Sequence, residues 1–425
     1  MKRRKLLAAV LYCAMLLCGC AQRDGCADRP AARETTENGT FPAENGEGTA
    51  GTYGSVTLSA GVGEESEETA AGRGEEPENN AVQPADESGD GEKTDEYGIP
   101  AYYYADDYLP GKIAEIRAHD EACALHGDGF IWITDTHYSR EGDPTPDNMG
   151  YSPLLIDKIV HETSVNRVVF GGDIMTDFTE DKEEAKTEFR ANRFRYPAPP
   201  VEYYQIRGNH DYNGVGSTPE TQRLTPAESY AVLSKDLESR AHVLDRSVYY
   251  FDNEFQRIRT FCVSCAYSDA IPKASQPLLY SAFADVPDGW SVLVLSHIGA
   301  HWDSESSSVV VMPEFENVAA ALDALKARSS FTYKGVTYDY TGTDVTVIGV
   351  ISGHTHNDYD ILTSGGVHII STACDKCLQG KHSAAPRKRN TVSEQCFDVV
   401  QIDTEQKMIY LTRIGAGEDR TVYYG

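Results

Sequence analysis

The chain has 425 residues, of which 40% are hydrophobic and 10% aromatic. This is enough apolar material for a large core, so a wholly disordered protein is excluded. The formal net charge of −28 disfavours binding of nucleic acid through the overall electrostatic field, although a local basic groove is compatible with it. The length allows two or three domains, or one large domain with extensions.

The first 20 residues have the pattern of an export signal. Four basic residues at positions 2–5 precede an apolar run over 6–17, which is shorter than the ~20 residues of a membrane-spanning helix. The run ends in Leu-Cys-Gly-Cys, which resembles the lipobox of bacterial lipoproteins. The resemblance implies that residues 1–19 are removed. It also implies that lipid on Cys20 anchors the protein at the extracytoplasmic face of the cell membrane. The alternative is an ordinary cleaved signal.

Residues 20–98 are predicted to be an acidic, disordered tether. Positions 21–98 contain 19 Asp or Glu and 5 Lys or Arg, Leu58 is their only leucine, and they show no apolar periodicity. Such a composition cannot bury enough apolar surface to fold. A flexible coil of this length has an r.m.s. reach of about 50 Å. We therefore expect it to hold a folded domain, residues 99–425, away from the membrane.

From residue 101 onward, predicted helices and strands alternate. A helix is expected over 108–124, a buried strand over 130–133, and a helix over 152–163 that starts at Ser-Pro. The alternation predicts an α/β layer fold with mixed sheets. The other expected strands are 167–170, 201–206, 247–252, 257–264, 291–295, 344–351, 367–371, 397–403 and 408–413, and the other expected helices are 180–193, 226–237 and 314–327.

Five short polar motifs directly follow predicted strands. Because sites in open α/β sheets form at the carboxyl ends of strands, we expect these motifs to converge. Carboxylate, amide and imidazole ligands without thiolate suit Mn, Fe, Zn or Co. Neighbouring glycines permit tight turns without a Cβ clash. The motifs are Asp135-Thr136-His137, Gly171-Gly172-Asp173, Gly208-Asn209-His210-Asp211, Ser296-His297 and Gly353-His354-Thr355-His356.

In this order, the motifs resemble those of the calcineurin-like metallophosphoesterases. The resemblance implies a sandwich of two mixed β-sheets flanked by helices, with a binuclear metal site at the C-terminal ends of the strands. It also implies hydrolysis of phosphate mono- or diesters by a hydroxide that two divalent metal ions activate. One metal ion would be bound by Asp135, His137, Asp173 and His356, and the other by Asp173, Asn209, His297 and His354, with Asp173 shared.

The resemblance places His210 beside the leaving group, where an imidazole can donate a proton or stabilise negative charge. In many relatives, a carboxylate three residues after the shared Asp orients this histidine. Here that position is Thr176. Asp177 and Asp211 are both candidates for the orienting role, and the sequence does not choose between them.

Some polar residues outside the motifs also allow two interpretations. His301 is interpreted as a loop residue in preference to one that faces substrate. Asp143 and Asn148 either reach the mouth of the site or form a polar turn. The basic triplet at 387–389 either meets an anionic substrate or is solvated, and solvation is preferred.

Two Cys-x-x-Cys pairs invite a zinc interpretation. We do not favour it, since Cys262 and Cys265 fall in a predicted strand, where residues i and i+3 point to opposite faces. Export would permit disulfides, and Cys374 with Cys377 is then the preferred pair.

Two other functions are considered beside the phosphoesterase. The first is a non-catalytic envelope module that binds metal or ligand, which the complete ligand set and His210 disfavour. The second is an exported nuclease, which the net charge disfavours. The sequence does not distinguish phosphate monoesters from diesters, and it does not choose the metal ions.

Overall fold

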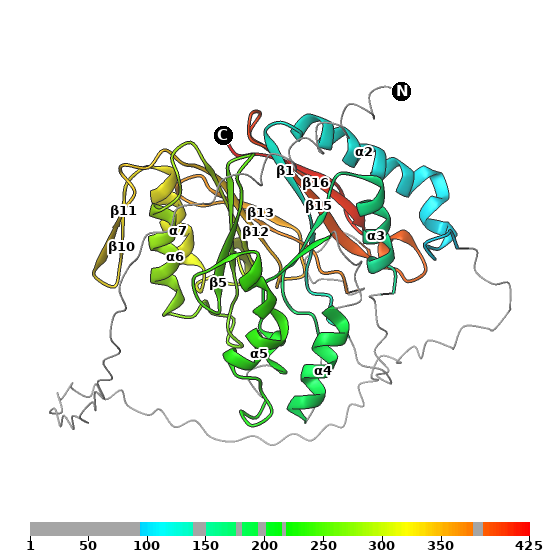
Figure 1. Cartoon of the computed structure of the whole chain (residues 1–425), viewed down its shortest axis with the longest axis horizontal. Helices are drawn as coiled ribbons and strands as arrows, with labels where there is room; N and C mark the ends of the chain where they lie inside the picture. Colours follow the sequence, from blue (N-terminus) through cyan, green and yellow to red (C-terminus); the bar gives the residue numbers. More distant parts are fainter. Residues whose placement is uncertain (1–93, 139–149, 176–180, 194–200, 215–217, 377–385) are drawn as a thin grey trace, which may run out of the picture. The chain divides into compact units, whose positions relative to one another are not determined.

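Two mixed β-sheets pack face to face in this computed structural model, which describes residues 94–138, 150–175, 181–193, 201–214, 218–376 and 386–425 (Figure 1). Within these ranges, one sheet has the order β17 (Arg420–Tyr423), β16 (Met408–Gly415), β15 (Cys396–Asp403), β1 (Gly127–Ile133), β2 (Arg167–Phe170) and β3 (Glu202–Gln205). The other has the order β13 (Tyr359–Leu362), β14 (His368–Ser371), β12 (Thr346–Ser352), β7 (Ser291–Ser296), β6 (Ile258–Val263), β5 (Val248–Asn253) and β4 (His242–Val243). Two separate hairpins are β8 (Ala300–Asp303) with β9 (Ser308–Val311), and β10 (Ser330–Tyr333) with β11 (Val336–Asp339).

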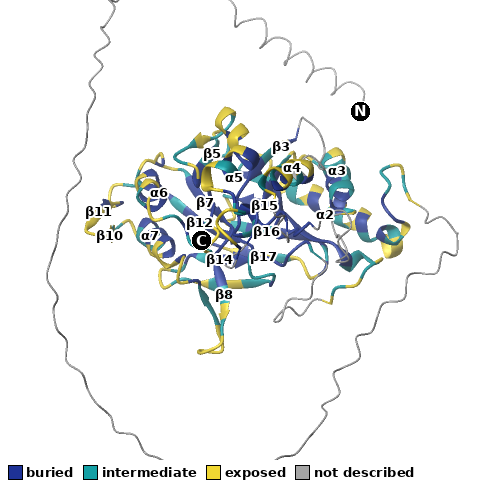
Figure 2. Cartoon of the chain, turned by 90° about the horizontal axis from the view of Figure 1, so that it is seen from below, coloured by how far each residue is buried: buried dark blue, intermediate teal, exposed yellow. Residues whose placement is uncertain are grey.

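The central strands are buried on both faces. Consecutive side chains of a strand point to opposite sides, and in these strands both kinds are buried. In β1, Phe130 and Trp132 join the apolar cluster between the two sheets, whereas Ile131 and Ile133 pack on the outer side under helices. β7 divides its apolar residues between the same inner cluster and a third cluster. Figure 2 shows these strands as the buried interior of the fold.

Helices cover the outer face of each sheet (Figure 1). Apolar residues of α2 (Tyr108–Cys123), α3 (Ser152–Glu162), α4 (Lys182–Arg193) and α5 (Pro226–Leu233) pack with the first sheet, and those of α6 (Ser275–Ala284) and α7 (Glu316–Lys326) pack with the second. The 3-10 turns are Ala101–Asp107, His210–Tyr212, Lys235–Ser239 and Val392–Glu394. The predicted fold class, a sandwich of two mixed sheets flanked by helices, is confirmed.

Most predicted elements are present within a few residues of the expected bounds, with informative exceptions. The helix expected over 226–237 is wrong in its second part, because α5 ends at Leu233 and a separate 3-10 turn follows. Ser152 is the first residue of α3 and does not cap it through a side-chain hydrogen bond, because its hydroxyl donates to the Asp375 carboxylate. The sequence patterns did not predict α6, either of the separate hairpins or the edge strands β13 and β17.

The described chain begins at Thr94, inside the segment predicted as tether. Thr94 pairs with Pro100, and the Asp95 carboxylate accepts hydrogen bonds from the Tyr104 hydroxyl and from the backbone N–H of Ile99. These contacts attach residues 94–100 to the folded domain. No helix of the described ranges has the length and apolar character needed to cross a bilayer. The predicted signal, Cys20 and nearly all of the predicted tether lie outside these ranges.

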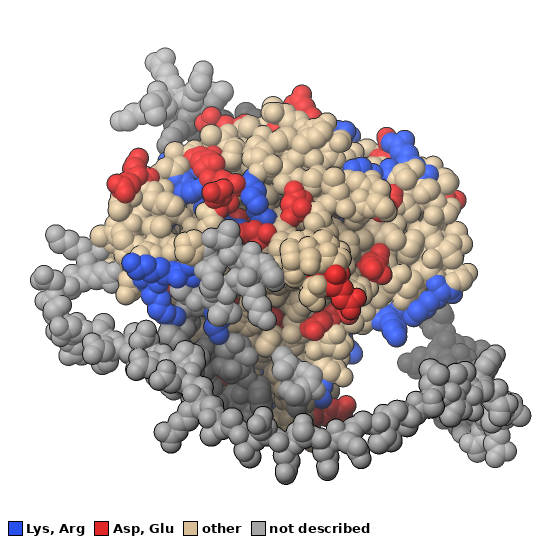
Figure 3. Space-filling view, turned by 180° about the vertical axis from the view of Figure 1, so that it is seen from behind, with Lys and Arg blue, Asp and Glu red and all other residues tan. Residues whose placement is uncertain are grey.

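Acidic and basic side chains are interspersed on the face of the domain shown in Figure 3. The segment 21–98 has 19 Asp or Glu and 5 Lys or Arg, and residues 99–425 are also acidic overall.

Candidate metal centre

The five polar motifs meet at one place, because the strands that precede them end at the same side of the sandwich. The loops after β1, β2 and β3 bring residues from the first sheet, and those after β7 and β12 bring residues from the second. Their ligand atoms lie within 4.8 Å of one another in three groups, namely Asp135 with His137 and His356, His137 with Asp173 and His210, and Asp173 with His297 and His354.

In the first group, two imidazoles and a carboxylate converge on one point. Nε2 of His137 lies 2.9 Å from Nε2 of His356, and Oδ1 of Asp135 lies 3.7 and 3.4 Å from these nitrogens. The other oxygen of Asp135 accepts hydrogen bonds from the Thr134 hydroxyl and the His354 backbone N–H. Oδ1 is buried and has no hydrogen-bond partner in the described structure. This unpartnered oxygen, facing two imidazole nitrogens, fits a bound divalent cation.

The third group is centred on His297, which is fully buried. Its Nδ1 donates to the carbonyl of Gly171 at 2.8 Å, which directs Nε2 towards the other predicted ligands. Nε2 lies 3.2 Å from Asp173 Oδ2, 3.1 Å from Asn209 Oδ1 and 3.2 Å from His354 Nδ1. The structure therefore brings together all four residues that the resemblance assigns to the second metal ion.

Asp173 belongs to both sides of the cluster. Its Oδ2 lies 3.2 Å from Nε2 of His297 and 3.8 Å from Nε2 of His137, so it faces an imidazole of each ligand set. Its Oδ1 accepts the backbone N–H of His210 at 2.9 Å. One carboxylate thus lies between the two sets and also fixes the backbone of the predicted proton donor.

Five predicted ligands have left-handed backbone conformations, which non-glycine residues rarely adopt. Such residues cost about 1–3 kcal/mol each and cluster at functional sites, where the surrounding fold enforces them. Their positive φ angles are 52° for Asp135, 42° for His137, 56° for Asp173, 69° for His354 and 57° for His356.

Glycine is required beside these ligands, as the sequence analysis expected. Gly172 has a φ of +104°, and a Cβ there would lie 2.6 Å from the backbone N of Gly208 and from Nδ1 of His297. A Cβ on Gly353 would meet Thr134 and Asp135. Both contacts are too short for real Cβ atoms, so the ligand loops pack at distances that only glycine allows.

The electrostatics of the cluster suit a cation. Burial lowers the pKa of His137 to about 3 and that of His354 to about 4, so these imidazoles are neutral and keep a lone pair. Burial also lowers the pKa of His297, but the negative charges of Asp173 and Asp135 raise it to about 10. Burial raises the pKa of Asp173, yet the nearby His297 holds it well below its usual value. Metal binding would therefore displace a proton from His297.

His210 lies at the edge of the cluster and is half-buried. Its ring meets that of His137 edge-on, with the ring centroids 4.9 Å apart. The carboxylate of Asp211 accepts the backbone N–H groups of Gly208, Asp173 and Ile174 at 2.8–2.9 Å. In the described part of the chain it makes no hydrogen bond to the His210 ring, and its visible role is to join the β2 and β3 loops. Asp177, the other candidate for orienting His210, lies outside the described residues.

Arg207 supports the same loop and was not singled out by the sequence analysis. Its guanidinium is fully buried, donates to the carbonyls of Pro226 and Arg246, and lies near the rings of Tyr212 and Tyr230. These contacts fix the residue immediately before the Gly-Asn-His motif. The only sequence signal for this supporting role was the position of Arg207 next to that motif, because its partners lie 19 and 39 residues away in the chain.

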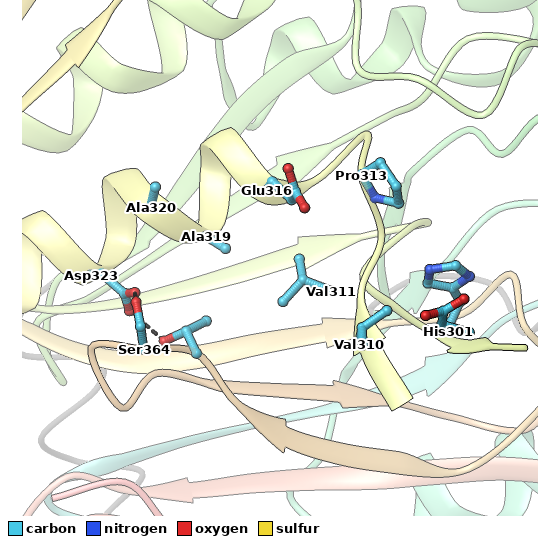
Figure 4. A pocket seen from close by; sticks show the side chains of 11 residues that line it. His301, Val310, Val311, Pro313, Glu316, Ala319, Ala320, Asp323 and Ser364 are labelled. Atoms are coloured by element: carbon cyan, nitrogen blue, oxygen red, sulfur yellow. Dashed lines mark hydrogen bonds between the residues drawn. The ribbon is translucent and has the colours of Figure 1, made fainter. Parts of the chain in front are cut away.

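The interpretation of His301 as a loop residue is wrong, because it lies in β8. It lines a pocket of about 600 Å³ between the β8–β9 hairpin and α7, together with residues such as Val311, Glu316 and Asp323 (Figure 4). Ser364 donates to Asp323 at the other end of this pocket.

The preferred interpretation of the basic triplet at 387–389, solvation, holds for the exposed Lys388 but is wrong for Arg387. The Arg387 guanidinium donates to the carbonyls of Cys374 and Asp375 and to those of Ser393 and Glu394. It thereby connects two loops. Cys262 and Cys265 are buried thiols, and Asp143, Asn148 and Cys377 lie outside the described residues.

A two-sheet sandwich with this carboxylate and imidazole cluster at its strand ends defines a metal-dependent phosphoesterase. The family model described as calcineurin-like phosphoesterase matches residues 130–358, which is more than half of the chain. The chain belongs to this family, and it is a hydrolase that acts on phosphoric ester bonds.

Solved structures of similar fold are distant in sequence. A dimetal phosphatase from Danio rerio is 15% identical, with a TM-score of 0.45 over 71% of this chain and 99% of that chain. GAP50, the anchor in the inner membrane complex of Plasmodium, is 10% identical, with a TM-score of 0.39 over 71% and 89%. An NAD nucleotidase from Haemophilus influenzae is 13% identical, with a TM-score of 0.34 over 69% and 49%. No curated protein sequence matches the chain.

Proposed function

We propose that this protein is a binuclear metallophosphoesterase that hydrolyses phosphate mono- or diesters outside the cytoplasmic membrane. The position of Asp173 carries the binuclear assignment, since its Oδ2 lies between His297 and His137, which belong to different ligand sets. When bound, two divalent cations such as Mn, Fe, Zn or Co supply the Lewis acidity that polarises the phosphoryl group and activates a water molecule.

Most side chains of the centre bind metal ions, and His210 transfers a proton. His210 donates a proton to the leaving alkoxide, because its backbone is held by Asp173 and its ring lies beside that of His137 at the edge of the cluster. Asp211 keeps the two loops in register through its three backbone hydrogen bonds. One cation would be held by Asp135, His137, Asp173 and His356, and the other by Asp173, Asn209, His297 and His354.

Metal removal tests this assignment. Exhaustive chelation should abolish hydrolysis of phosphate esters, and Mn, Co or Zn should restore it. Asp173→Asn should deplete both cations, because it weakens both ligand sets, whereas His137→Ala should deplete mainly one. Metal analysis of the folded variants gives the occupancy directly. Full activity in verified metal-free protein would contradict the mechanism, and unchanged occupancy in Asp173→Asn would remove Asp173 from the shared position.

The proposed location rests on the N-terminal sequence, in which a basic segment and an apolar run end at Cys20. Mass spectrometry of the native protein should find a diacylglyceryl group on Cys20 as the first residue. Cys20→Ser should release the protein from the membrane fraction or leave the signal uncleaved. A native protein that is cut elsewhere and carries no lipid would contradict the anchor without affecting the catalytic assignment.

A further inference from the structure

A small polar pocket lies at the end of the sandwich opposite to the metal centre. It has a volume of about 190 Å³ and forms where α2 ends, where β1 and β2 begin, and where a turn joins β5 to β6. The predicted metal ligands instead follow the other ends of β1 and β2. The described residues that line the pocket include no Lys, Arg or His, and its carboxylates and side-chain amides belong to Asp120, Asp128, Asn166, Asn253, Gln256 and Gln401.

The amide of Gln401 is fixed in one orientation at this pocket. Gln401 lies in β15 and is 1% exposed. Its Nε2 donates to the carbonyl of Ile116 at 2.9 Å and to Oδ1 of Asp120 at 2.7 Å. Turning the amide over would place its oxygen against these two acceptors, so the oxygen stays on the other side. This Oε1 atom is buried and makes no hydrogen bond in the described structure.

A second amide, that of Gln256 in the turn between β5 and β6, is held in a similar way. Its Nε2 donates to the carbonyl of Ala124 at 3.3 Å, and its backbone N–H donates to Oδ1 of Asn253 at 3.1 Å. Its Oε1 is also buried and has no hydrogen-bond partner within the described ranges. Two residues that line one pocket thus each carry a buried oxygen that lacks a donor. Such atoms are explained by a bound ion or by water.

The charges around the pocket favour an ion. Asp120 accepts hydrogen bonds from Gln401 and, at 2.9 Å, from the backbone N–H of Ser164, but it has no ionic partner in the part of the chain that the structure describes. Asp128 pairs with Arg167 at 2.8 Å, which offsets its charge. The C-terminal end of α2 adds partial negative charge. The pocket therefore attracts a cation.

The ligand types favour calcium among the cations. Carboxylate and amide oxygens, completed by water, are the ligands of Ca²⁺, which accepts irregular geometry, whereas Mg²⁺ demands a near-ideal octahedron. Cys123 also lines the pocket. Burial and the nearby carboxylates raise the pKa of its thiol to about 12, so the thiol stays protonated and is a poor ligand for zinc.

We propose that this pocket is a calcium site, in which the Asp120 carboxylate, the Oε1 atoms of Gln256 and Gln401, and water bind the ion. Gln401 belongs to the first sheet, and Gln256 lies in a turn of the second. The ion therefore joins the two sheets at the end that is remote from the metal centre. It stabilises the fold and takes no part in hydrolysis, so the inference does not depend on the proposed function.

Calcium binding to the full-length protein tests the site. The protein is first loaded with Zn and freed of excess, so that calcium does not occupy the metal centre. Calorimetry should then give a Kd for calcium of about 10⁻⁴–10⁻³ M, as for sites with few charged ligands. Saturating calcium should raise the Tm by about 2–4 °C, because it binds the folded state alone. The same concentration of Mg²⁺ should raise it less.

Variants that each remove one ligand locate the ion. Asp120→Asn removes the charge and keeps an oxygen for Gln401, and Gln256→Met removes an amide oxygen at similar side-chain length. Both should weaken calcium binding about 10- to 100-fold and lose most of the Tm shift. Glu121→Gln is the matched control, because Glu121 is exposed, follows Asp120 on α2 and is not among the lining residues. It should bind calcium as the wild type does.

Each variant is measured with and without calcium, so a change of stability that is unrelated to the ion cancels. Equal calcium-induced shifts in the wild type, Asp120→Asn and Gln256→Met would assign the binding to another part of the chain and overturn the proposal. A wild-type protein that calcium does not stabilise would show that the pocket holds only water, which also overturns it. Calcium should leave the hydrolysis of phosphate esters unchanged, and a failure of the proposed function would not alter the binding result.

Discussion

At the scale of single residues, His210 differs from the other histidines of the centre in that its backbone is held by a hydrogen bond to Asp173. Asp173 fixes its backbone, while its ring is half-buried and lies against that of His137. A proton donor needs a fixed position and access to the leaving group, and both conditions are met here.

His210→Ala should therefore keep both metal ions and lose far more rate on alkyl phosphates than on nitrophenyl phosphates. General acid assistance contributes about 10²- to 10⁴-fold and matters most when the leaving alkoxide is basic. Steady-state rates on both substrate types, together with metal analysis, check this expectation. Equal losses on both types would indicate positioning or charge stabilisation, and loss of a metal ion would make His210 a ligand.

The residues brought together at the centre are those that the five motifs named, because each motif directly follows a buried strand. The motifs did not reveal the left-handed backbone at Asp135 or His354, which depends on how the two sheets pack. They also did not reveal that the Asp211 carboxylate accepts hydrogen bonds from the backbone N–H groups of Asp173 and Gly208. These groups meet only when the β2 and β3 loops are adjacent.

At the scale of elements, α5 shows how local sequence signals work. Thr225 and Glu228 form a reciprocal capping box at its N-terminus, and Glu228 also pairs with Lys186 of α4 at 3.1 Å. The signal Thr-Pro-x-Glu predicts where the helix starts. The end of α5 at Leu233 and the short β8–β9 and β10–β11 hairpins carry no comparable signal, so the sequence did not locate them.

The capping box makes stability depend on pH. The Thr225 backbone N–H lowers the pKa of Glu228, and Lys186 adds to this effect against partial burial, so that the pKa falls from its ordinary 4.5 to about 2. The ionised form therefore stabilises the fold. Its contribution is complete above about pH 4.5 and is lost as the pH falls towards 2.

Glu228→Gln should reduce the free energy of unfolding at pH 7, and the difference from wild type should shrink as the pH falls through this range. Chemical denaturation at several pH values measures it. The control is Glu220→Gln, an exposed carboxylate outside the capping box. A constant difference between pH 7 and pH 3 would contradict the ionic contribution of Glu228.

At the scale of the whole domain, a buried charge network joins the last strands of the first sheet to a metal loop of the second. Arg413 in β16 pairs with Asp398 in β15 at 2.9 Å and with Asp358 at 2.7 Å, and Asp358 follows the His354–His356 motif. Arg413 and Asp398 are both 1% exposed. Sequence patterns showed β15 and β16 but not this pairing, which depends on the packing of the two sheets.

Arg413→Met should destabilise the domain by about 3–5 kcal/mol, because it leaves the buried Asp398 with only the more distant Arg420, 3.8 Å away. Arg328→Met is the matched control, since Arg328 pairs with Asp344 at the surface, where both side chains are more than half exposed. The control should cost less than about 1 kcal/mol. Urea unfolding of both variants gives the comparison, and similar losses in the two would contradict the role of the buried network.

The distribution of the ligands along the chain sets the timing of metal capture. Nε2 of His137 and Nε2 of His356 lie 2.9 Å apart, yet 219 residues separate them in sequence, and the two sheets contribute to each ligand set. Neither half of the chain can assemble a complete site alone, so the cations enter only after the sandwich has closed. If the chain is exported as proposed above, and in the unfolded state, the ions available outside the membrane, and not those of the cytoplasm, would decide which metal the enzyme carries.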